Sequence, residues 1–570
     1  MPRKFTVPWT GRYNTRISKS NNSSTTTAVV GFAVVGVMVV GQQTSPVDKD
    51  ERWINCFLTK EGAEEYAVKR PGAGVNSTPA AGSVGNTLLI WTGSGSKIIS
   101  AFGGTNSTLY NGTTSLGAIT GKAQFISETF TGTQQPTILI PSSDNTAWYT
   151  TEAAVTTAVT FTGDTHTNTT IDNISSTTGL LVGQLITGTG IQANTRIASI
   201  PTANSITTTL ATTATNAGIT VTRTILAKII DADFPSNAGY TLTGPFTTID
   251  GFNCIMTTDG KLWASDLNTA SGWTANSFDS ANDYPDVGIG LARWKDKQIA
   301  FGSESMQFFY NAGLTPFPLA SVGGSSTIKL GACSANAITS MSDYVFWCGG
   351  TDKGGLTIYQ YDGNVSRIST PEQDFQLVLS GTSSISLTAM RIYGKSFVFV
   401  NASQTTYVYC LEDKRWHEWI GDANLWSRCV GLSVGNQILT YSISTESTSG
   451  KVYVYNPETL TFLDDGAMFT ASIQSMNDDS KTNYRKFYDE FRLDADIEPV
   501  ESIMTLSVSD DDFQTFEVID SIDLSAPQKI TRLGSSNPDN WNRRAWKLTN
   551  SSNAAFRIRS ADYWADVGTA

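Results

Sequence analysis

Residues Ile299 to Tyr310 read IAFGSESMQFFY, and this stretch decides which fold the sequence predicts. A short apolar run, Ile299 to Phe301, enters a polar turn, and a second run rich in aromatic residues follows from Met306 to Tyr310. Two such runs joined by a tight turn are typical of a β-hairpin. Similar pairs of runs recur at 345–361, 397–411 and 438–455. We therefore expect consecutive antiparallel strands along most of the chain.

These hairpins recur at a nearly regular spacing of roughly 46 residues. Apolar strands bounded by Gly, Asp or Asn begin near Leu88, Ile138, Phe252, Ile299, Val345, Phe397 and Ile438. The one long gap becomes regular when residues 155–224 are set aside. Such a period predicts an all-β chain whose body is a β-propeller of six or seven blades. A series of two-layer β-sandwiches has nearly the same composition, and it stays open as the alternative fold.

Changes in composition divide the chain further. Residues 155–224 are rich in Thr and contain only four charged residues, so they predict a small β-sandwich-like module inserted on a loop between two repeat units. The propeller is expected in two parts, 48–154 and 225–467. From residue 468 the charge density rises again, and 468–570 predicts a C-terminal β domain or a closing sheet of the array.

Overall composition excludes two classes of protein. Hydrophobic residues make up 40% of the 570 residues, which is enough for a large core and excludes general disorder. The 39 Lys and Arg residues are outnumbered by 51 Asp and Glu residues, so the formal net charge is −12. A protein that grips DNA through its phosphates needs the opposite balance, which excludes a general DNA binder.

The first 47 residues form a basic arm with an apolar segment. All five of its charged residues are basic: Arg3, Lys4, Arg12, Arg16 and Lys19. The arm is either a solvated tail or a tether that docks on an acidic neighbour. The apolar segment 28–40 is 13 residues long, short of the roughly 20 that a helix needs to cross a bilayer. We interpret it as buried strand or subunit contact without a stable membrane span; a membrane role in some assembled state stays open.

Residues suited to catalysis or metal binding are scarce. The chain has only two histidines, so few residues are available for a histidine-based catalytic site or a zinc site. His166 lies in a Thr-rich stretch without nearby acids. His417 lies between Trp416 and Glu418, and we expect it to have a packing or turn role. The six cysteines contain no CxxC pair and are interpreted as buried reduced thiols: Cys56, Cys254, Cys333, Cys348, Cys410 and Cys429.

The acidic clusters indicate structural turns and not catalytic or metal-binding sites. Ser509 to Phe516 reads SDDDFQTF and approximates the structural turn known as an Asp box, with Phe513 in the usual place of glycine. Asp478-Asp479 and Asp510 to Asp512 lack the spacing of an EF-hand and are interpreted as solvated turn acids. Nucleotide-binding, nucleophile-elbow and zinc-protease motifs are all missing. The sequence therefore predicts no enzyme, no catalytic residue, no metal and no cofactor.

Several segments taken together resemble a known family. They are DKDERWINCFLTKEG and YAVKRPG within 48–72, IIDADFPSNAGYTLTGPFTTIDGFNCIMTTDGKLWASDLN at 229–268, DVGIGLARWKDKQIAFGSESMQFFYNAGLTPFPLA at 286–320, LSVSDDDFQTF at 506–516 and ITRLGSSNPDNWNRRAWKLTNSSNAAFRIRS at 530–560. This series resembles the packaged-DNA stabilisation proteins of short-tailed bacteriophages (podoviruses), the tail hub or nozzle family. The resemblance covers about two thirds of the chain in consistent order; the N-terminal arm and the 155–224 insert depart from it.

The resemblance implies a structural protein in the distal part of the phage tail. Similar proteins form a ring of copies, generally six, below the head-to-tail adaptor. Such a ring extends the channel that retains double-stranded DNA and conducts it during ejection without sequence-specific binding, and it neighbours tail fibres or spikes. The sequence does not identify the residues that line the channel. Two alternatives are a receptor- or glycan-binding tail protein and a sialidase-like hydrolase.

Overall fold

The computed structural model describes residues 3–6 and 51–568, except for 62–63, 96, 133–134, 282–283, 285, 324–326, 352–353, 393, 403–404, 421–427, 430–437, 442–448, 456–460, 480–481, 528–529 and 533–539. The apolar segment 28–40 and most of the basic arm therefore lie outside the described residues. Among the residues described, no helix combines the length and the apolar character that a membrane crossing requires.

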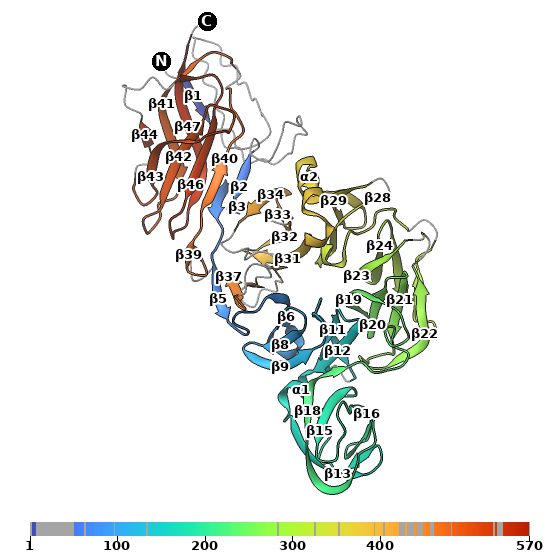
Figure 1. Cartoon of the computed structure of the whole chain (residues 1–570). Helices are drawn as coiled ribbons and strands as arrows, with labels where there is room; N and C mark the ends of the chain where they lie inside the picture. Colours follow the sequence, from blue (N-terminus) through green and yellow to red (C-terminus); the bar gives the residue numbers. More distant parts are fainter. Residues whose placement is uncertain are drawn as a thin grey trace.

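The body is built from antiparallel four-stranded blades (Figure 1). The first three are β6 (Gly85–Trp91), β7 (Lys97–Phe102), β8 (Ser107–Asn111) and β9 (Thr114–Ile119); β10 (Ser127–Thr131), β11 (Gln135–Ser142), β12 (Thr146–Thr151) and β18 (Thr215–Lys228); and β19 (Leu242–Ile249), β20 (Phe252–Thr257), β21 (Lys261–Ser265) and β22 (Trp273–Ser280). The fourth and fifth are β23 (Gly288–Trp294), β24 (Lys297–Gly302), β25 (Met306–Asn311) and β26 (Leu319–Ser321); and β27 (Ile338–Met341), β28 (Tyr344–Thr351), β29 (Gly354–Tyr361) and β30 (Val365–Arg367). The last two are β31 (Ser386–Ile392), β32 (Lys395–Asn401), β33 (Thr406–Cys410) and β34 (Arg415–Trp419); and β35 (Arg428–Cys429), β36 (Ile438–Tyr441), β37 (Val452–Tyr455) and β5 (Ala73–Ser77).

These seven blades of the described chain close into a ring. The innermost strand of each blade contacts its neighbour, from β6 through β10, β19, β23, β27 and β31 to β35, and β36 of the seventh blade returns to β6. The predicted all-β propeller is confirmed, and its blade number is seven. Each strand start chosen from the sequence falls in a different blade: Leu88 lies in β6 and the other six lie in the second strand of their blades.

The ring is closed by a strand from near the N-terminus. β5 is the outer strand of the seventh blade and pairs antiparallel with β37, where Val75 lies opposite Tyr453. The last blade of the chain is therefore completed by residues that precede the first blade. This arrangement removes the free edge that an open array of blades would expose.

The Thr-rich insert is a small module with its own core. Its strands are β13 (Thr160–His166), β14 (Thr170–Asp172), β15 (Gln184–Gly188), β16 (Ile197–Thr202) and β17 (Ser205–Thr208), and the short helix α1 (Glu152–Thr156) precedes them. Isoleucines dominate the buried cluster between them. β18 begins in the module and ends by pairing with β12, so the module lies between the third and fourth strands of the second blade, whereas the sequence had suggested a loop between two repeat units.

A β-sandwich lies beside the propeller, and both ends of the described chain belong to it (Figure 1). One sheet contains β1 (Arg3–Thr6), β3 (Cys56–Glu61), β4 (Glu64–Lys69), β41 (Lys486–Ala495), β44 (Ile530–Arg532), β45 (Asn540–Trp541) and β47 (Arg557–Val567). The other contains β2 (Arg52–Ile54), β40 (Ala471–Gln474), β42 (Ile503–Ser509), β43 (Glu517–Asp523) and β46 (Ala545–Asn550). Buried residues from both sheets, including Phe491, Trp546 and Tyr563, form the core between them.

The first part of the sandwich comes from segments that the sequence assigned elsewhere. β2, β3 and β4 fall in the segment 48–154 expected to open the propeller, but β3 and β4 pair with each other and β4 with β47, while β2 lies between β40 of the sandwich and β34 of the sixth blade. β1 contains Arg3 and Lys4 of the basic arm and pairs with β47. The sequence could not predict these pairings, because a short strand does not show which other strand it pairs with. The pairing of β2 with β40 joins residues more than 400 positions apart.

A close approach of two backbones in the fifth blade yields a stability prediction. A Cβ atom on Gly349 of β28 would lie 1.7 Å from the carbonyl oxygen of Gly331, so any side chain must push the backbones apart. We expect Gly349→Ala to destabilise the protein by about 1–3 kcal/mol and to lower its Tm by several degrees. The matched control is Gly104→Ala, because a Cβ there meets nothing within 4 Å. Equal Tm values for the two variants in thermal unfolding would contradict the packing described.

Candidate functional site

The junction between the propeller and the sandwich is formed by β2. This strand pairs parallel with β34 of the sixth blade, with Ile54 opposite Glu418, and antiparallel with β40 of the sandwich. The blade and one sandwich sheet thus form a single nine-stranded sheet. Arg52 strengthens the pairing because its Nε and Nη2 atoms donate to Glu418 Oε1 and Oε2 at 2.9 and 2.5 Å. A hydrogen-bonded sheet across the junction restrains how the two bodies move relative to each other.

The next strand, β3, contributes side chains to both bodies. Alternate residues of a strand point to opposite faces, so Cys56 and Leu58 join the sandwich core while Phe57 does not. Phe57 packs in the cluster shared by the sixth and seventh blades. Its ring centroid lies 5.3 Å from that of Phe397 and 6.2 Å from that of Trp419. One aromatic side chain from a sandwich strand thereby becomes part of the propeller core.

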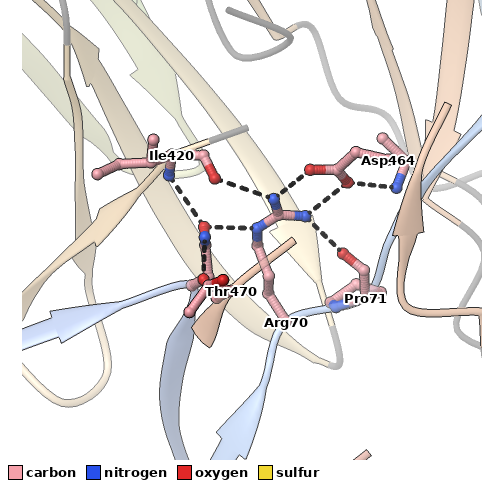
Figure 2. Close-up of polar contacts among 7 residues, drawn as sticks. Arg70, Pro71, Ile420, Asp464 and Thr470 are labelled. Atoms are coloured by element: carbon pink, nitrogen blue, oxygen red, sulfur yellow. Dashed lines mark hydrogen bonds and ion pairs between the residues drawn. The ribbon is translucent and has the colours of Figure 1, made fainter. Parts of the chain in front are cut away.

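A buried ion pair lies at the centre of the junction (Figure 2). Arg70 and Asp464 of β38 (Leu463–Asp464) both have fully buried side chains, and Arg70 Nη1 and Nη2 donate to the carboxylate oxygens at 2.9 and 2.5 Å. Arg70 also donates to Asn55 Oδ1 at 2.8 Å and to the carbonyl oxygens of Pro71 and Ile420 at 3.0 and 3.3 Å. All five N–H groups of the guanidinium are therefore satisfied, which a buried charge requires.

Asn55 connects this ion pair to the surrounding chain. Its Oδ1 atom accepts from Arg70 and from the backbone N–H of Ile420, and its Nδ2 atom donates to the carbonyl of Thr470. Asn55 has φ +56°, a left-handed conformation that asparagine tolerates better than most residues. Asn55 thus links the guanidinium of Arg70 to three strand ends: the end of β2, the end of β34 and the start of β40.

Lys69, the residue before Arg70, binds the sandwich side of the junction. Its ammonium donates to Asn550 Oδ1 at 3.0 Å and to the carbonyl of Ser552 at 2.7 Å, and it lies 4.8 Å from the ring centroid of Phe469. Burial lowers the pKa of Lys69 to about 7. Two consecutive basic side chains from the YAVKRPG stretch therefore serve the contact between the two bodies.

The two histidines occupy separate places. His417 lies in β34, where its ring packs edge-on against Trp53 with centroids 6.0 Å apart; burial lowers its pKa to about 3, so it is neutral at physiological pH. His166 lies in the inserted module, 2.8 Å from Asp172 Oδ1. This corrects the expectation that His166 has no nearby acid, because the β13–β14 hairpin folds Asp172 back onto it. The two rings are parts of different bodies and form no common site.

The acids of the Asp-box stretch hold the turn together. Asp511 accepts from the backbone N–H groups of Gln514 and Thr515 and from the hydroxyls of Ser509 and Thr515. These hydrogen bonds lower the pKa of Asp511 to about 2. Phe513 adopts φ +71° in the position where glycine is usual, and its side chain is buried.

The neighbouring acids are also bound to protein groups. Asp510 pairs with the buried Arg544, Asp512 accepts from Asn477 Nδ2, and Asp478 accepts from the hydroxyl of Tyr563. Among the described residues, no group of three or more His, Cys, Asp or Glu side chains is arranged to hold a metal ion.

Five of the cysteines are described as free thiols. Cys56, Cys254, Cys348 and Cys410 are buried and Cys333 is half-buried. Burial raises the pKa of Cys254 and of Cys410 to about 12, which makes both poor nucleophiles. Cys429 lies in the short strand β35.

An aromatic cleft lies between the fourth and fifth blades, and the sequence did not predict it. It encloses about 470 Å³ and is lined by Trp294, Lys297, Phe308, Tyr361 and Asn364, among others. The Trp294 and Tyr361 ring centroids are 4.8 Å apart, and Trp294 Nε1 donates to the carbonyl of Asp343. Trp294 and Lys297 are three positions apart at a hairpin, but Tyr361 comes from another blade, so no local pattern marks the cleft.

Comparison with known proteins identifies the propeller. Residues 174–420 match the family model described as bacteriophage P22 Gp10, beta-propeller. This match covers less than half of the chain and agrees with the family that the sequence resembles. The suspected family is thereby confirmed for a stretch that ends at Ile420, one of the residues bound by Arg70. The family is one of phage tail structural proteins.

The other two comparisons carry no argument about the function of this chain. Among solved structures, BamB from Moraxella catarrhalis is similar to 73% of this chain and 97% of its own, with 10% sequence identity and a TM-score of 0.33. No curated protein sequence matches the chain.

The junction makes a prediction about stability. Replacing Asp464 with Asn leaves the Arg70 charge buried without its counter-ion, so we expect the free energy of unfolding to fall by about 3–5 kcal/mol. Replacing both partners by Arg70→Met with Asp464→Leu removes the charge and should restore a large part of this loss. The control is Lys60→Ala, which removes the exposed partner of an ion pair with the partly buried Glu65 and should cost about 1 kcal/mol. In denaturant titrations, an Asp464→Asn variant as stable as Lys60→Ala would contradict the role of the pair.

The Asp511 turn makes a prediction about acid stability. Its pKa in the folded protein is about 2, below the ordinary 3.8, so the fold favours the charged form. The resulting stabilisation is complete above the ordinary pKa and disappears as the pH falls through the folded-state value. The Tm difference between the wild type and Asp511→Asn should therefore be constant above pH 4 and shrink between about pH 4 and pH 2. A difference that does not change with pH would show that the carboxylate does not hold the turn.

Proposed function

We propose that this protein is a structural component of the virion, the tail nozzle or hub of a short-tailed phage. In this proposal a ring of copies, six by analogy with the family, extends the channel below the head-to-tail adaptor. The ring retains packaged double-stranded DNA and conducts it during ejection. The observation that carries the proposal is the match of residues 174–420 to the P22 Gp10 propeller family.

The architecture suits a mechanical role. A closed ring of blades continues through β2 into the sandwich, so that force on one body is transmitted to the other through backbone hydrogen bonds. The acids that the sequence offered for chemistry are bound to arginine, asparagine, tyrosine and backbone groups. These observations support a protein that works through shape, and we propose that it is not an enzyme.

The charge of the chain supports passage of DNA without binding. Six copies would carry six times −12, or −72. Acidic walls repel phosphates and let a duplex slide, whereas a basic bore would bind each turn of DNA. The charged residues of the innermost described strands are Glu128, Arg293, Arg391 and Arg428. Because these are mostly basic, we propose that DNA passes through the centre of the ring of copies and not through the propeller of one copy.

The proposed partners are other copies of this chain, the head-to-tail adaptor above the ring and tail fibres or spikes beside it. The basic arm remains our candidate for a tether to the adaptor. β1 takes Arg3 and Lys4 into the sandwich, so the residues of the arm that would make this contact lie beyond Thr6.

A second candidate function is binding of a host-surface glycan. The aromatic cleft between the fourth and fifth blades favours it, because sugar rings stack on aromatic faces, the ring of Trp294 is partly exposed there, and Lys297 and Asn364 offer polar groups. The Asp-box turn does not favour the sialidase-like alternative, because the oxygens of Asp511 are used within the turn.

The nozzle proposal is tested with DNA-filled capsids that lack this protein. We expect the purified protein to bind them and to protect the genome from added nuclease, while heat-denatured protein does not. Native mass spectrometry of the free protein or of the released tail should show a ring of six times 61.3 kDa. Capsids that retain DNA equally well without the protein, or a chain that stays monomeric on the particle, would contradict the proposal. A glycan-binding protein would leave DNA retention unchanged.

A further inference from the structure

Two cysteines lie opposite each other where the chain passes from the fourth to the fifth blade. Cys333 belongs to the connection between β26 and β27, and Cys348 lies in β28. The backbone N–H of Cys333 donates to the carbonyl oxygen of Cys348 at 2.9 Å. Two residues earlier, the N–H of Gly331 donates to the carbonyl of Gly350 at 3.4 Å. The connection therefore runs alongside β28 in the opposite direction, and Cys333 lies next to Cys348.

This register places the two thiols within bonding reach. Cys348 belongs to a buried apolar cluster, and Cys333 packs against the same cluster, so the two side chains lie on the same side of the backbone contact. Disulfides form across Cα separations of about 4.4–6.8 Å. The two thiols also share a hydrogen bond with each other.

We propose that Cys333 and Cys348 are a site of reversible disulfide formation, closed when the protein meets a small disulfide oxidant such as oxidised glutathione. The Cys333 thiolate attacks one sulfur of the oxidant, and one glutathione thiolate leaves. The Cys348 thiol then gives up its proton and attacks the Cys333 sulfur of the mixed disulfide, releasing the second glutathione. Two protein thiols are oxidised, and one glutathione disulfide is reduced to two thiols.

The exposure and the pKa of each thiol determine which cysteine reacts first. Cys333 is half-buried, whereas Cys348 is fully buried, so only Cys333 is open to a molecule from solution. The hydrogen bond from Cys348 lowers the pKa of Cys333, and the same bond together with burial raises that of Cys348. Because the thiolate is the nucleophile, Cys333 reacts first and Cys348 resolves.

The bond would link the connection from the fourth blade covalently to the fifth blade. It would close a loop that contains β27, the innermost strand of the fifth blade, and tie it to the connection from the fourth. Disulfides persist in oxidising surroundings and are reduced in the bacterial cytoplasm. The inference does not depend on the proposed nozzle function, since it concerns one chain and one oxidant.

The test uses the full-length folded protein incubated with oxidised glutathione, then alkylated and digested with trypsin. Cys333 and Cys348 share one tryptic peptide, 330–353, because no Lys or Arg lies between Lys329 and Lys353. We expect this peptide to be two hydrogens lighter and unalkylated, and to become doubly alkylated after dithiothreitol. The peptides with Cys56, Cys254 and Cys410 should remain unoxidised and serve as internal controls.

Two variants separate the roles of the thiols. Cys348→Ser should stop at the mixed disulfide and gain one glutathione on Cys333, while Cys333→Ser should gain nothing, because Cys348 is inaccessible. A wild-type peptide that carries two alkyl groups after oxidation would overturn the proposal, even if a variant fails to fold. Glutathione on Cys348 of Cys333→Ser would overturn the order of attack.

Discussion

Residues 51 to 77 are the constraint on which the rest of the molecule depends. In one short passage the chain adds β2 to the sixth blade, inserts Phe57 into the propeller core, buries Arg70 against Asp464 and supplies β5 to close the seventh blade. The buried ion pair is the most demanding of these contacts, because a guanidinium is tolerated in the interior only when every N–H finds a partner. Five acceptor atoms meet this condition: one each on Asn55, the adjacent Pro71 and Ile420, and two on Asp464.

The geometry of this passage couples the closure of the ring to the attachment of the sandwich. Ala73, which begins β5, donates its N–H to Asp464, the counter-ion of Arg70. The strand that completes the propeller is thus held by the carboxylate that neutralises the junction. The proposed role in a phage tail requires two bodies that do not separate, and the residues shared between closure and attachment meet this requirement.

The fold could be predicted to a large extent because its units are local. Alternating apolar runs and tight turns placed one strand start in each of the seven blades, and the Asp-box stretch formed the turn that its residues favour. The junction could not be predicted, since Arg70 and Asp464 are 394 positions apart and neither is marked by its neighbours. The partnership of His166 with Asp172 was missed because it depends on where one hairpin turns.

The central claim is that propeller and sandwich form one body through the β34–β2–β40 pairing. Amide hydrogen exchange followed by mass spectrometry tests it most directly, because exchange reports how often each strand opens. The account predicts that amides of β2 and β34 exchange as slowly as those of the buried blade strand β32. Fast exchange in β2 and at the end of β34, with slow exchange in β32 and β46, would mean that the two bodies separate in solution and would contradict the account.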